Sequence, residues 1–447
     1  MDEMNDEHLL QLLDEGALNQ LKTEANEMNP ADIADFFEKV PKEKRLLVFR
    51  LLTKDNGADA FSFMDNDMQE EIISAISDQE MEHIIDELAM DDVVDFLGEM
   101  PANVVTRVLR NTDESTRKII NQFLNYPDDS AGSLMTIEFV QFHQDMTVGE
   151  AMAQLRKTGV DKETIYNCYV IDHRRVLVGV VSLRTLLLSK DEAIVKDIME
   201  EDVIYVHTLD DQEETADLFK KYDLIALPVV DNEKRLVGII TVDDIVDVIE
   251  QENTEDMEKM SALIPSEDEY LKTSVLQLAK NRIVWLLVLM VSGTLSSAII
   301  THFESVLASS VALAAFFPIL MGTGGNAGSQ ASTLIIRGMA VGEIEPKDIL
   351  LVIWKELRVG IIAGAVLGVA NFVRILVVND VSFAVNFTVS LSMAITVILA
   401  KGVGCTLPII AKKLHLDPAI MAGPLISTVV DCLALMIFFN VARVLVL

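Results

Sequence analysis

Five long apolar stretches follow Tyr270, and they constrain the fold more than any other feature of the chain. They lie at about 281–302, 311–336, 349–378, 383–410 and 418–446. Each stretch is long enough to cross a hydrocarbon core of about 30 Å as a helix. A buried helical core in a soluble domain is the alternative, but the charged residues are swept into the joints between the stretches. We therefore predict five membrane-spanning helices.

The charge of the chain divides at the same place. Residues 271–447 carry 12 Lys and Arg against 8 Asp and Glu, whereas the whole chain of 447 residues has a net charge of −34. Residues 1–270 therefore carry a net charge of −38. Such a surface repels a phosphate backbone, which argues against nucleic acid as a partner. The sequence predicts an acidic soluble half joined to a half whose partner is membrane lipid.

Cysteine use and the basic residues indicate where the acidic half lies. The three cysteines fit no disulfide or zinc spacing, and a lone Cys168 indicates a reducing compartment. The start, MDEMNDEHLL, lacks the basic residues and apolar run of a signal peptide. Basic residues gather before the first span and in the joints after the second and fourth spans, where we place Lys401. The positive-inside rule then predicts a multi-pass protein of the cell (inner) membrane, with cytoplasmic N-terminal domains and the C-terminus outside.

A glycine-rich segment within the second apolar stretch is unusual for a helix that faces lipid. Residues 318–333 read PILMGTGGNAGSQAST, and so many glycines and polar side chains would fray such a helix. Small residues also let helices approach closely, which is the packing alternative. We favour a segment that bends or packs tightly beside a water-filled path and offers oxygen atoms to a solute. The candidate pore-lining residues are Gly322, Gly325, Asn326, Gly328, Gln330 and Thr333.

Asp431 is a carboxylate deep within the last apolar stretch. An ionised group there costs about 3 kcal/mol or more without a partner, so it is a candidate functional residue. Ala419, Gly423, Ser427 and Asp431 recur every four residues and would form one stripe on a helix, while Pro424 would free a backbone carbonyl. Oxygen ligands suit a hard cation such as Mg²⁺. The alternative is that Asp431 pairs with a basic residue of another span.

One carboxylate per chain is few ligands for a divalent ion. A two-fold homodimer would place two of them around an axial path. Mg²⁺ usually binds through one or two carboxylates and keeps several of its waters. A site of this kind would hold a hydrated ion loosely enough for conduction.

The acidic half contains two kinds of repeat. PADIADFFEKVP at 30–41 is echoed by DDVVDFLGEMP at 91–101, which indicates a stacked, superhelical all-α domain. Farther on, VLVGVVS at 176–182 recurs as LVGIIT at 236–241 in an α/β pattern. This tandem resembles a pair of CBS domains, and the resemblance implies ATP as a ligand. The second copy keeps Thr241-Val-Asp243, a pair that meets the ribose in that family, whereas the first departs from it with Arg184-Thr185.

Carboxylates crowd the second repeat and the residues that follow it. A solvated acidic face is the usual explanation of such a run. The density here is high enough that like charges would repel, by about 1 kcal/mol for a pair in contact in water, and a divalent cation would offset this. We expect a helix over about 250–270 to join this acidic region to the first span.

The order of these parts resembles the MgtE family of magnesium channels and transporters. GTGGNAGSQ at 322–330 and the run Asp417-Pro-Ala, Pro424 and Asp431 carry the resemblance. It implies a homodimer whose pore is lined by the second and fifth spans. Asp431 and Ser427 would meet the metal, and Gly423 and Pro424 would form the gate. The expected domains are 1–130 (acidic helical domain), 131–199 and 200–252 (CBS repeats), 253–279 (connecting helix) and 280–447 (five-helix membrane domain).

The resemblance also implies a cytosolic Mg²⁺ sensor that closes the pore when Mg²⁺ is abundant. The expected sensor carboxylates are Asp59, Asp91, Asp95, Asp211, Glu213, Asp223, Asp244, Asp247, Glu252, Glu255 and Asp256. The predicted function is Mg²⁺-selective uptake with negative feedback. A broader transporter of Co²⁺, Mn²⁺ or Ca²⁺ and a membrane sensor that conducts nothing are the alternatives. The sequence has no phosphate-binding loop or nucleophile–base pair, which argues against an enzyme.

Overall fold

The computed structural model describes residues 2–266, 270–271 and 273–446, and its two compact units divide between Ile249 and Glu250. The first unit begins with a run of short helices. They are α1 (Asp2–Glu15), α2 (Leu18–Ala25), α3 (Pro30–Lys39), α4 (Lys42–Phe49), α5 (Lys54–Ser62), α6 (Asn66–Ala75), α7 (Asp78–Glu87), α8 (Met90–Glu99), α9 (Ala102–Asn111) and α10 (Glu114–Phe123).

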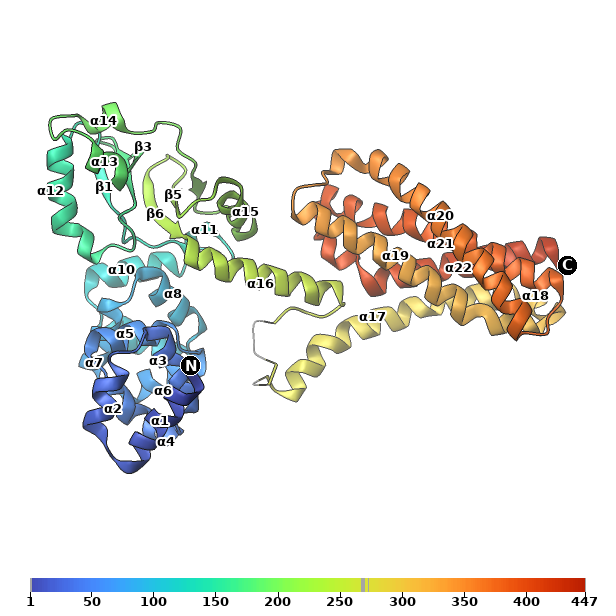
Figure 1. Ribbon diagram of the computed structural model, residues 1–447, viewed down its shortest axis with the longest axis horizontal. Helices are drawn as coiled ribbons and strands as arrows, with labels where there is room; N and C mark the ends of the chain where they lie inside the picture. Colours follow the sequence, from blue (N-terminus) through green and yellow to red (C-terminus); the bar gives the residue numbers. More distant parts are fainter. Residues whose placement is uncertain (1, 267–269, 272, 447) are drawn as a thin grey trace. The chain divides into compact units, whose positions relative to one another are not determined.

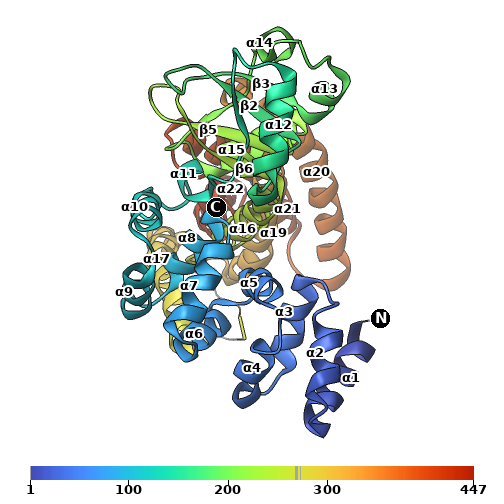
Figure 2. The same cartoon turned by 90° about the vertical axis from the view of Figure 1, so that its left-hand side faces the viewer.

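Side-chain caps set where these helices start. Asn29, Thr53, Asp65 and Ser77 each accept a hydrogen bond from a backbone N–H in the first turn of the helix that follows. From α3 onward the helices pack on the next but one, so that α3, α5, α7 and α9 form one row and α4, α6 and α8 another (Figure 2). The predicted stacked helical array is confirmed.

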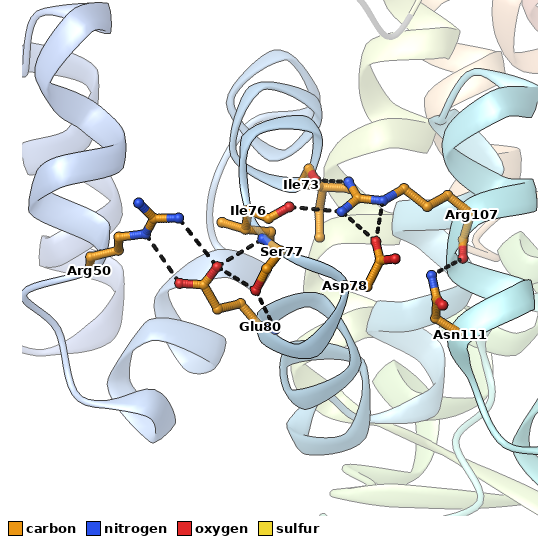
Figure 3. A network of polar contacts seen from close by, with 8 residues as sticks. All are labelled: Arg50, Ile73, Ile76, Ser77, Asp78, Glu80, Arg107 and Asn111. Atoms are coloured by element: carbon orange, nitrogen blue, oxygen red, sulfur yellow. Dashed lines mark hydrogen bonds and ion pairs between the residues drawn. The ribbon is translucent and has the colours of Figure 1, made fainter.

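Arg107 joins three helices of this array. Its guanidinium donates to the carbonyls of Ile73 (2.7 Å) and Ile76 (2.8 Å) at the end of α6, and to Asp78 Oδ1 (2.8 Å) at the start of α7 (Figure 3). The last carbonyls of a helix have no partner within it, so an Arg fork can satisfy them. Arg107 thereby fixes α9 against the turn between α6 and α7.

The rest of the first unit is a tandem pair of small α/β repeats. Their strands are β1 (Gln141–His143), β2 (Asn167–Ile171), β3 (Leu177–Ser182), β4 (Val206–His207), β5 (Ala226–Val230) and β6 (Leu236–Thr241). Their helices are α11 (Ala131–Leu134), α12 (Val148–Thr158), η1 (Gly159–Asp161), α13 (Leu183–Leu188), α14 (Val195–Ile198) and α15 (Gln212–Tyr222).

The two repeats have the same sheet topology. In each, the first strand pairs parallel with the second, and the second pairs antiparallel with the third. The repeats meet where Leu177 N–H donates to the Lys234 carbonyl (2.9 Å) and Leu236 N–H donates to the Arg175 carbonyl (3.1 Å). These exchanged bonds relate the repeats by an approximate two-fold axis, and the predicted tandem pair is confirmed.

The second unit contains the long apolar helices. After α16 (Val242–Met260), which begins in the first unit, its elements are α17 (Val275–His302), α18 (Glu304–Ser309), η2 (Val311–Phe316), α19 (Phe317–Ala340), η3 (Pro346–Asp348), α20 (Ile349–Val378), α21 (Phe383–Lys413), η4 (Pro418–Met421) and α22 (Gly423–Leu445). Among the described residues, five segments are long and apolar enough to cross a membrane, as predicted. The helices α19, α20 and α22 all pack against α21 (Figure 1).

Two expectations for this unit were wrong. The helix expected over about 250–270 ends at Met260, and residues 267–269 of the expected range lie outside the described residues. The glycine-rich segment was expected to bend or to pack tightly, and of these two the bend is wrong, since α19 is continuous from Phe317 to Ala340.

Close packing explains why α19 tolerates its glycines. A Cβ atom on Gly324 would lie 2.7 Å from Thr396 Cγ2, and one on Gly328 would lie 2.8 Å from Ile426 Cγ2. The closest approach involves Gly404 of α21, where a Cβ would lie 2.2 Å from the carbonyl oxygen of Gly328. The small residues let the backbones of α19 and α21 come together, as the packing alternative requires.

We predict that Gly404→Ala lowers the melting temperature of the purified protein. The added methyl group collides with a backbone carbonyl that cannot rotate away, and overpacking of this kind costs about 1–3 kcal/mol or more. Gly402→Ala is the matched control, since a Cβ there meets nothing within 4 Å. Alanine is the better helix former, so the control should melt at the same temperature or higher. Equal melting temperatures for the two variants would contradict the predicted contact.

Candidate functional site

The predicted pore residues of α19 lie on two different faces of the helix. Gly322, Asn326, Gln330 and Thr333 are exposed and follow helical spacing along one face. Gly325 and Gly328 were expected to line the path, but they are buried, and a Cβ on Gly325 would lie 3.2 Å from Ser427 Oγ. The polar face is therefore open, whereas these two glycines serve the packing of α19 on its neighbours.

The start of α22 differs from the predicted stripe. Ala419 lies in the separate 3-10 turn η4, so only Gly423, Ser427 and Asp431 share a face of α22. We expected Pro424 to break a hydrogen bond inside the helix. It stands instead in the first turn, where the helix needs no N–H donor, so no internal hydrogen bond is lost. Ser427 Oγ donates to the Gly423 carbonyl (3.0 Å). Its lone pairs remain available to a cation.

Asp431 lies in the third turn of α22 and is half-buried. Within the part of the chain that the structure describes, no hydrogen bond or ion pair joins its carboxylate to another side chain. The alternative that Asp431 pairs with a basic residue of another span is therefore not supported in a single chain. An unpaired carboxylate in an apolar helix needs a cation or water beside it.

The one buried lysine among the described residues of the membrane unit has a different partner. Lys401, which we placed in a joint, lies well inside α21, with its Nζ 3.8 Å from Glu356 Oε2 of α20. Both side chains are nearly buried, at 8% and 11% exposure. Glu356 Oε2 has no hydrogen bond, so the pair is held by charge alone.

We predict that Lys401→Met destabilises the protein, because it leaves the Glu356 carboxylate buried without a counter-charge. Breaking a buried pair in this way costs about 3–5 kcal/mol. The double variant Lys401→Met, Glu356→Gln should recover most of the lost melting temperature, since no charge remains. A double variant as unstable as the single one would rule out this explanation.

The end of α16 is tied to the start of α22 within the second unit. Lys259 Nζ contacts Asp417 Oδ2 (2.7 Å) and Glu255 Oε1 (2.6 Å), and a Cβ on Gly423 would lie 2.7 Å from the Met260 carbonyl oxygen. Burial raises the pKa of Asp256 to about 6, and the Asp417 carboxylate adds to this effect. The predicted sensor residues Glu255 and Asp256 therefore lie against the joint that leads into α22.

A cluster of carboxylates joins the helical domain to the CBS pair within the first unit. Burial, followed by the charges of Asp244 and Asp92, raises the pKa of Asp91 well above its usual value. Burial and four neighbouring carboxylates raise the pKa of Asp92 to about 7. The pKa of Glu163 is raised by burial and by Asp243 and Asp244. We call Asp91, Asp92, Glu163, Asp243 and Asp244 the acidic cluster.

The acidic cluster places like charges where little water can separate them. Each pH unit by which a carboxyl pKa is raised corresponds to about 1.4 kcal/mol against the ionised form. Asp244 also accepts a hydrogen bond from Thr241 Oγ1 (2.6 Å), which fixes its side chain at the start of α16. A divalent cation bound by several of these oxygens would remove the repulsion.

The other predicted sensor residues are not all gathered in one place. Asp211 and Asp223 cap opposite ends of α15, so a single chain does not bring them together.

Asp59 of α5 has an exposed side chain. Its pKa is raised, mainly by partial burial of the carboxylate and then by the charge of Asp55. Asp95 acts electrostatically on Asp92 and so borders the acidic cluster. Of the remainder, Glu213 is in the first turn of α15, and Asp247 and Glu252 are on α16.

Sequence reasoning missed Asp92, Glu163, Asp243, Glu356 and Lys401. Asp243 was noted as a ribose ligand and as one of the crowded carboxylates, but it was not included among the expected sensor residues. Asp92 was one acid in a long acidic sequence. No local sequence pattern indicates Glu163, because only the folded chain places it beside Asp243 and Asp244. Lys401 and Glu356 lie within apolar stretches, and their charge at that depth was the signal that could have found them. The sequence pattern also did not indicate a second group of possible metal ligands. It consists of Asp55, His83 and Glu87, whose ligand atoms lie within 4.8 Å of one another.

The chain combines five apolar helices long enough to cross a membrane, the unpaired Asp431 within one of them, and the acidic cluster of the first unit. Together these features indicate a membrane protein that binds or transports divalent cations. The family model described as divalent cation transporter matches residues 317–441. The models for the MgtE intracellular N domain and the CBS domain match residues 28–129 and residues 131–191 and 195–251. The chain belongs to the MgtE family.

Relatives extend this match to almost the whole chain. The magnesium transporter MgtE of Thermus thermophilus is 37% identical over 98% of this chain and 97% of its own length. The magnesium transporter MgtE of Bacillus subtilis is 35% identical over 96% and 95%. The crystal structure of the cytosolic domain of the Mg²⁺ channel MgtE in complex with ATP has a TM-score of 0.52 and 38% identity, and covers 54% of this chain and 98% of that one.

Proposed function

We propose that this protein carries Mg²⁺ across the cell (inner) membrane through a path formed by α19 and α22. The observation that carries the proposal is Asp431, a carboxylate without a partner in the described chain, on a helix packed beside the glycine-rich α19. Mg²⁺ binds through few carboxylates and keeps much of its water, so a sparse anionic site suits it. Ser427 and the exposed face of Gly322, Asn326, Gln330 and Thr333 add oxygen atoms along the same path.

The protein carries out this function as a homodimer. One Asp431 supplies a single negative charge, whereas two around a two-fold axis would match the charge of the ion. The polar face of α19 supports this, because an apolar helix does not expose amide side chains to lipid. The most apolar part of α17 contains no buried residue within the chain, which suits contact with lipid. The N-terminal domains are cytosolic and the C-terminus lies outside.

The cytosolic domains sense Mg²⁺ and close the path. The proposed domains are 1–130, 131–199, 200–252, 253–279 and 280–447. The expected sensor carboxylates lie in the first, third and fourth of these, and Glu163 of the acidic cluster lies in the second. Without Mg²⁺ the acidic cluster repels itself and opposes a compact arrangement, and bound Mg²⁺ favours that arrangement. A ligand shifts such an equilibrium only through its different affinity for the two forms, so several ions must act together.

Ion flux into liposomes that contain the purified protein tests this function. Mg²⁺ should enter faster than Ca²⁺, Mn²⁺ or Co²⁺, and its entry should slow as internal Mg²⁺ rises. Equal rates for all four ions would indicate the broader transporter. Flux no greater than in empty liposomes would indicate a sensor that conducts nothing.

We predict that Lys259→Met weakens the closure of the path by internal Mg²⁺. Lys259 is the cation between Glu255, Asp256 and Asp417, and without it these carboxylates repel the end of α16 from the start of α22. The measurement is the internal Mg²⁺ concentration that halves the flux, which should rise. Lys280→Met changes an exposed lysine near the start of α17 and serves as the control. An unchanged midpoint in Lys259→Met would show that this contact does not transmit the signal.

ATP is a further ligand to test, since a relative's cytosolic domain was solved with it. In this chain Asp243, the expected ribose partner, belongs to the acidic cluster, which repels a polyphosphate. We therefore expect ATP to bind here only when Mg²⁺ accompanies it. Calorimetric titration with ATP, with and without Mg²⁺, distinguishes the two cases.

A further inference from the structure

A histidine and two carboxylates meet where α5 packs on α7, in the helical domain of the first unit. Asp55 lies in the first turn of α5, and His83 and Glu87 lie one turn apart on α7, so that they share one face of that helix. One ligand atom from each residue lies within 4.8 Å of the others. We call Asp55, His83 and Glu87 the α5–α7 triad. None of the three belongs to the acidic cluster or to the expected Mg²⁺ sensor.

The imidazole of His83 has no hydrogen-bond partner among the described residues. Its Nε2 atom is buried and unpartnered, and its Nδ1 atom lies 3.7 Å from Glu87 Oε1, which is beyond hydrogen-bond distance. The side chain is only 26% exposed, so water reaches a small part of the ring. An imidazole whose nitrogens have no partner in the protein is free to coordinate a metal ion.

The two carboxylates of the triad lack a neutralising partner. Among the described residues neither Asp55 nor Glu87 forms an ion pair with a lysine or an arginine. Glu87 is the last residue of α7, and the last turn of that helix holds no basic residue, so the Glu87 charge opposes the helix dipole. A divalent cation at the triad would match the two negative charges.

The ligand atoms of the triad favour a transition metal over Mg²⁺. Imidazole nitrogen suits Zn²⁺ and its neighbours in the first transition series, whereas Mg²⁺ prefers oxygen ligands and keeps much of its water. Ligand atoms about 2.1 Å from one tetrahedral zinc ion lie about 3.4 Å apart. The triad atoms, which lie within 4.8 Å of one another, reach that spacing by small rotations, because their side chains are exposed or half-buried. A water molecule would complete the four-coordinate site.

We propose that the α5–α7 triad binds a divalent transition-metal ion of the Zn²⁺ class, through His83 and one oxygen atom each of Asp55 and Glu87. The bound ion joins α5 to α7 and stabilises the helical domain, as a ligand of the folded state does. The site differs in chemistry from the acidic cluster, which offers oxygen atoms alone.

Calorimetric titration of the full-length protein in nanodiscs with zinc chloride tests the proposal, with millimolar Mg²⁺ present throughout and no polyhistidine tag on the chain. Zn²⁺ should bind although Mg²⁺ is in excess. His83→Gln, Asp55→Asn and Glu87→Gln should each weaken this binding by about tenfold or more, because the loss of even an outer-shell partner costs that much. Zn²⁺ should also slow amide hydrogen exchange in α5 and α7 of the wild type and leave it unchanged in His83→Gln.

His8→Gln and Glu82→Gln are the matched controls. His8 pairs with one carboxylate, its Nε2 atom lying 3.3 Å from Glu24 Oε2, and Glu82 is an exposed acid of α7 outside the triad. Both variants should bind Zn²⁺ like the wild type. His83→Gln should melt like the wild type without metal, since its imidazole makes no hydrogen bond.

Two results would overturn the proposal. The first is that the wild type and His83→Gln do not differ in Zn²⁺ binding, whether both bind the ion or neither does. The second is that Mg²⁺ displaces Zn²⁺ from the wild type at equal concentration, which would make the triad one more Mg²⁺ site. Because the measurement is binding, its outcome does not depend on whether the protein conducts Mg²⁺.

Discussion

Replacing Asp431 by asparagine is expected to abolish Mg²⁺ flux and leave the fold intact. Asparagine has nearly the same shape, so the packing of α22 on α19 and α21 is preserved, but the negative charge that attracts the ion is lost. Two unit charges about 4 Å apart attract each other by about 4 kcal/mol at an effective dielectric constant of about 20, and each 1.4 kcal/mol is a factor of ten, so losing the carboxylate charge should lower the rate of entry more than a hundredfold. The measurement is the initial rate of Mg²⁺ entry into liposomes that contain equal amounts of protein.

Two further variants separate the charge from its position. Asp431→Glu keeps the charge and moves it by one methylene, so it should retain part of the flux. Asn440→Ala removes an exposed polar side chain from the same helix and should conduct normally. If Asp431→Asn conducts like the wild type while its melting temperature and oligomeric state are unchanged, Asp431 is not part of the path.

The membrane half was predicted well because hydropathy is a local property. The stretch expected at 383–410 is the helix Phe383–Lys413, and Asp431 stood out because a carboxylate is rare in such a run. Features that depend on helix packing were not predictable in this way. Lys401 was assigned to a joint although it is buried against Glu356. The glycines of α19 were expected to bend the chain or pack tightly, and only the fold shows that they bring α19 close to α21.

In the acidic half, too, features of contiguous segments were predictable from the sequence, whereas contacts between distant segments were not. Repeats identified the helical array and the CBS pair, because each repeat is a contiguous segment. Asp91 and Asp244 were both expected in the sensor, and the structure brings them together. Glu163 was not expected there, because only the fold places it beside Asp243 and Asp244.

Neutralising the acidic cluster is expected to uncouple the protein from internal Mg²⁺. In Asp91→Asn, Asp244→Asn two like charges disappear from a buried site, so the protein should melt at a higher temperature than the wild type in the absence of Mg²⁺. The same change removes two oxygen ligands, so added Mg²⁺ should raise the melting temperature less. Asparagine can still cap α16 through Thr241, which keeps that helix start intact.

The flux of this double variant gives the functional counterpart. The internal Mg²⁺ concentration that halves the flux should rise at least about tenfold, the equivalent of 1.4 kcal/mol of lost coupling. Asp86→Asn removes one charge from an exposed position of α7 and controls for the loss of a carboxylate outside the acidic cluster. The double variant and the control differ in where the charge is removed, as well as in number. If both respond to Mg²⁺ like the wild type, the acidic cluster does not bind the regulatory ion, and the sensor must lie among the carboxylates of α15 and the second half of α16.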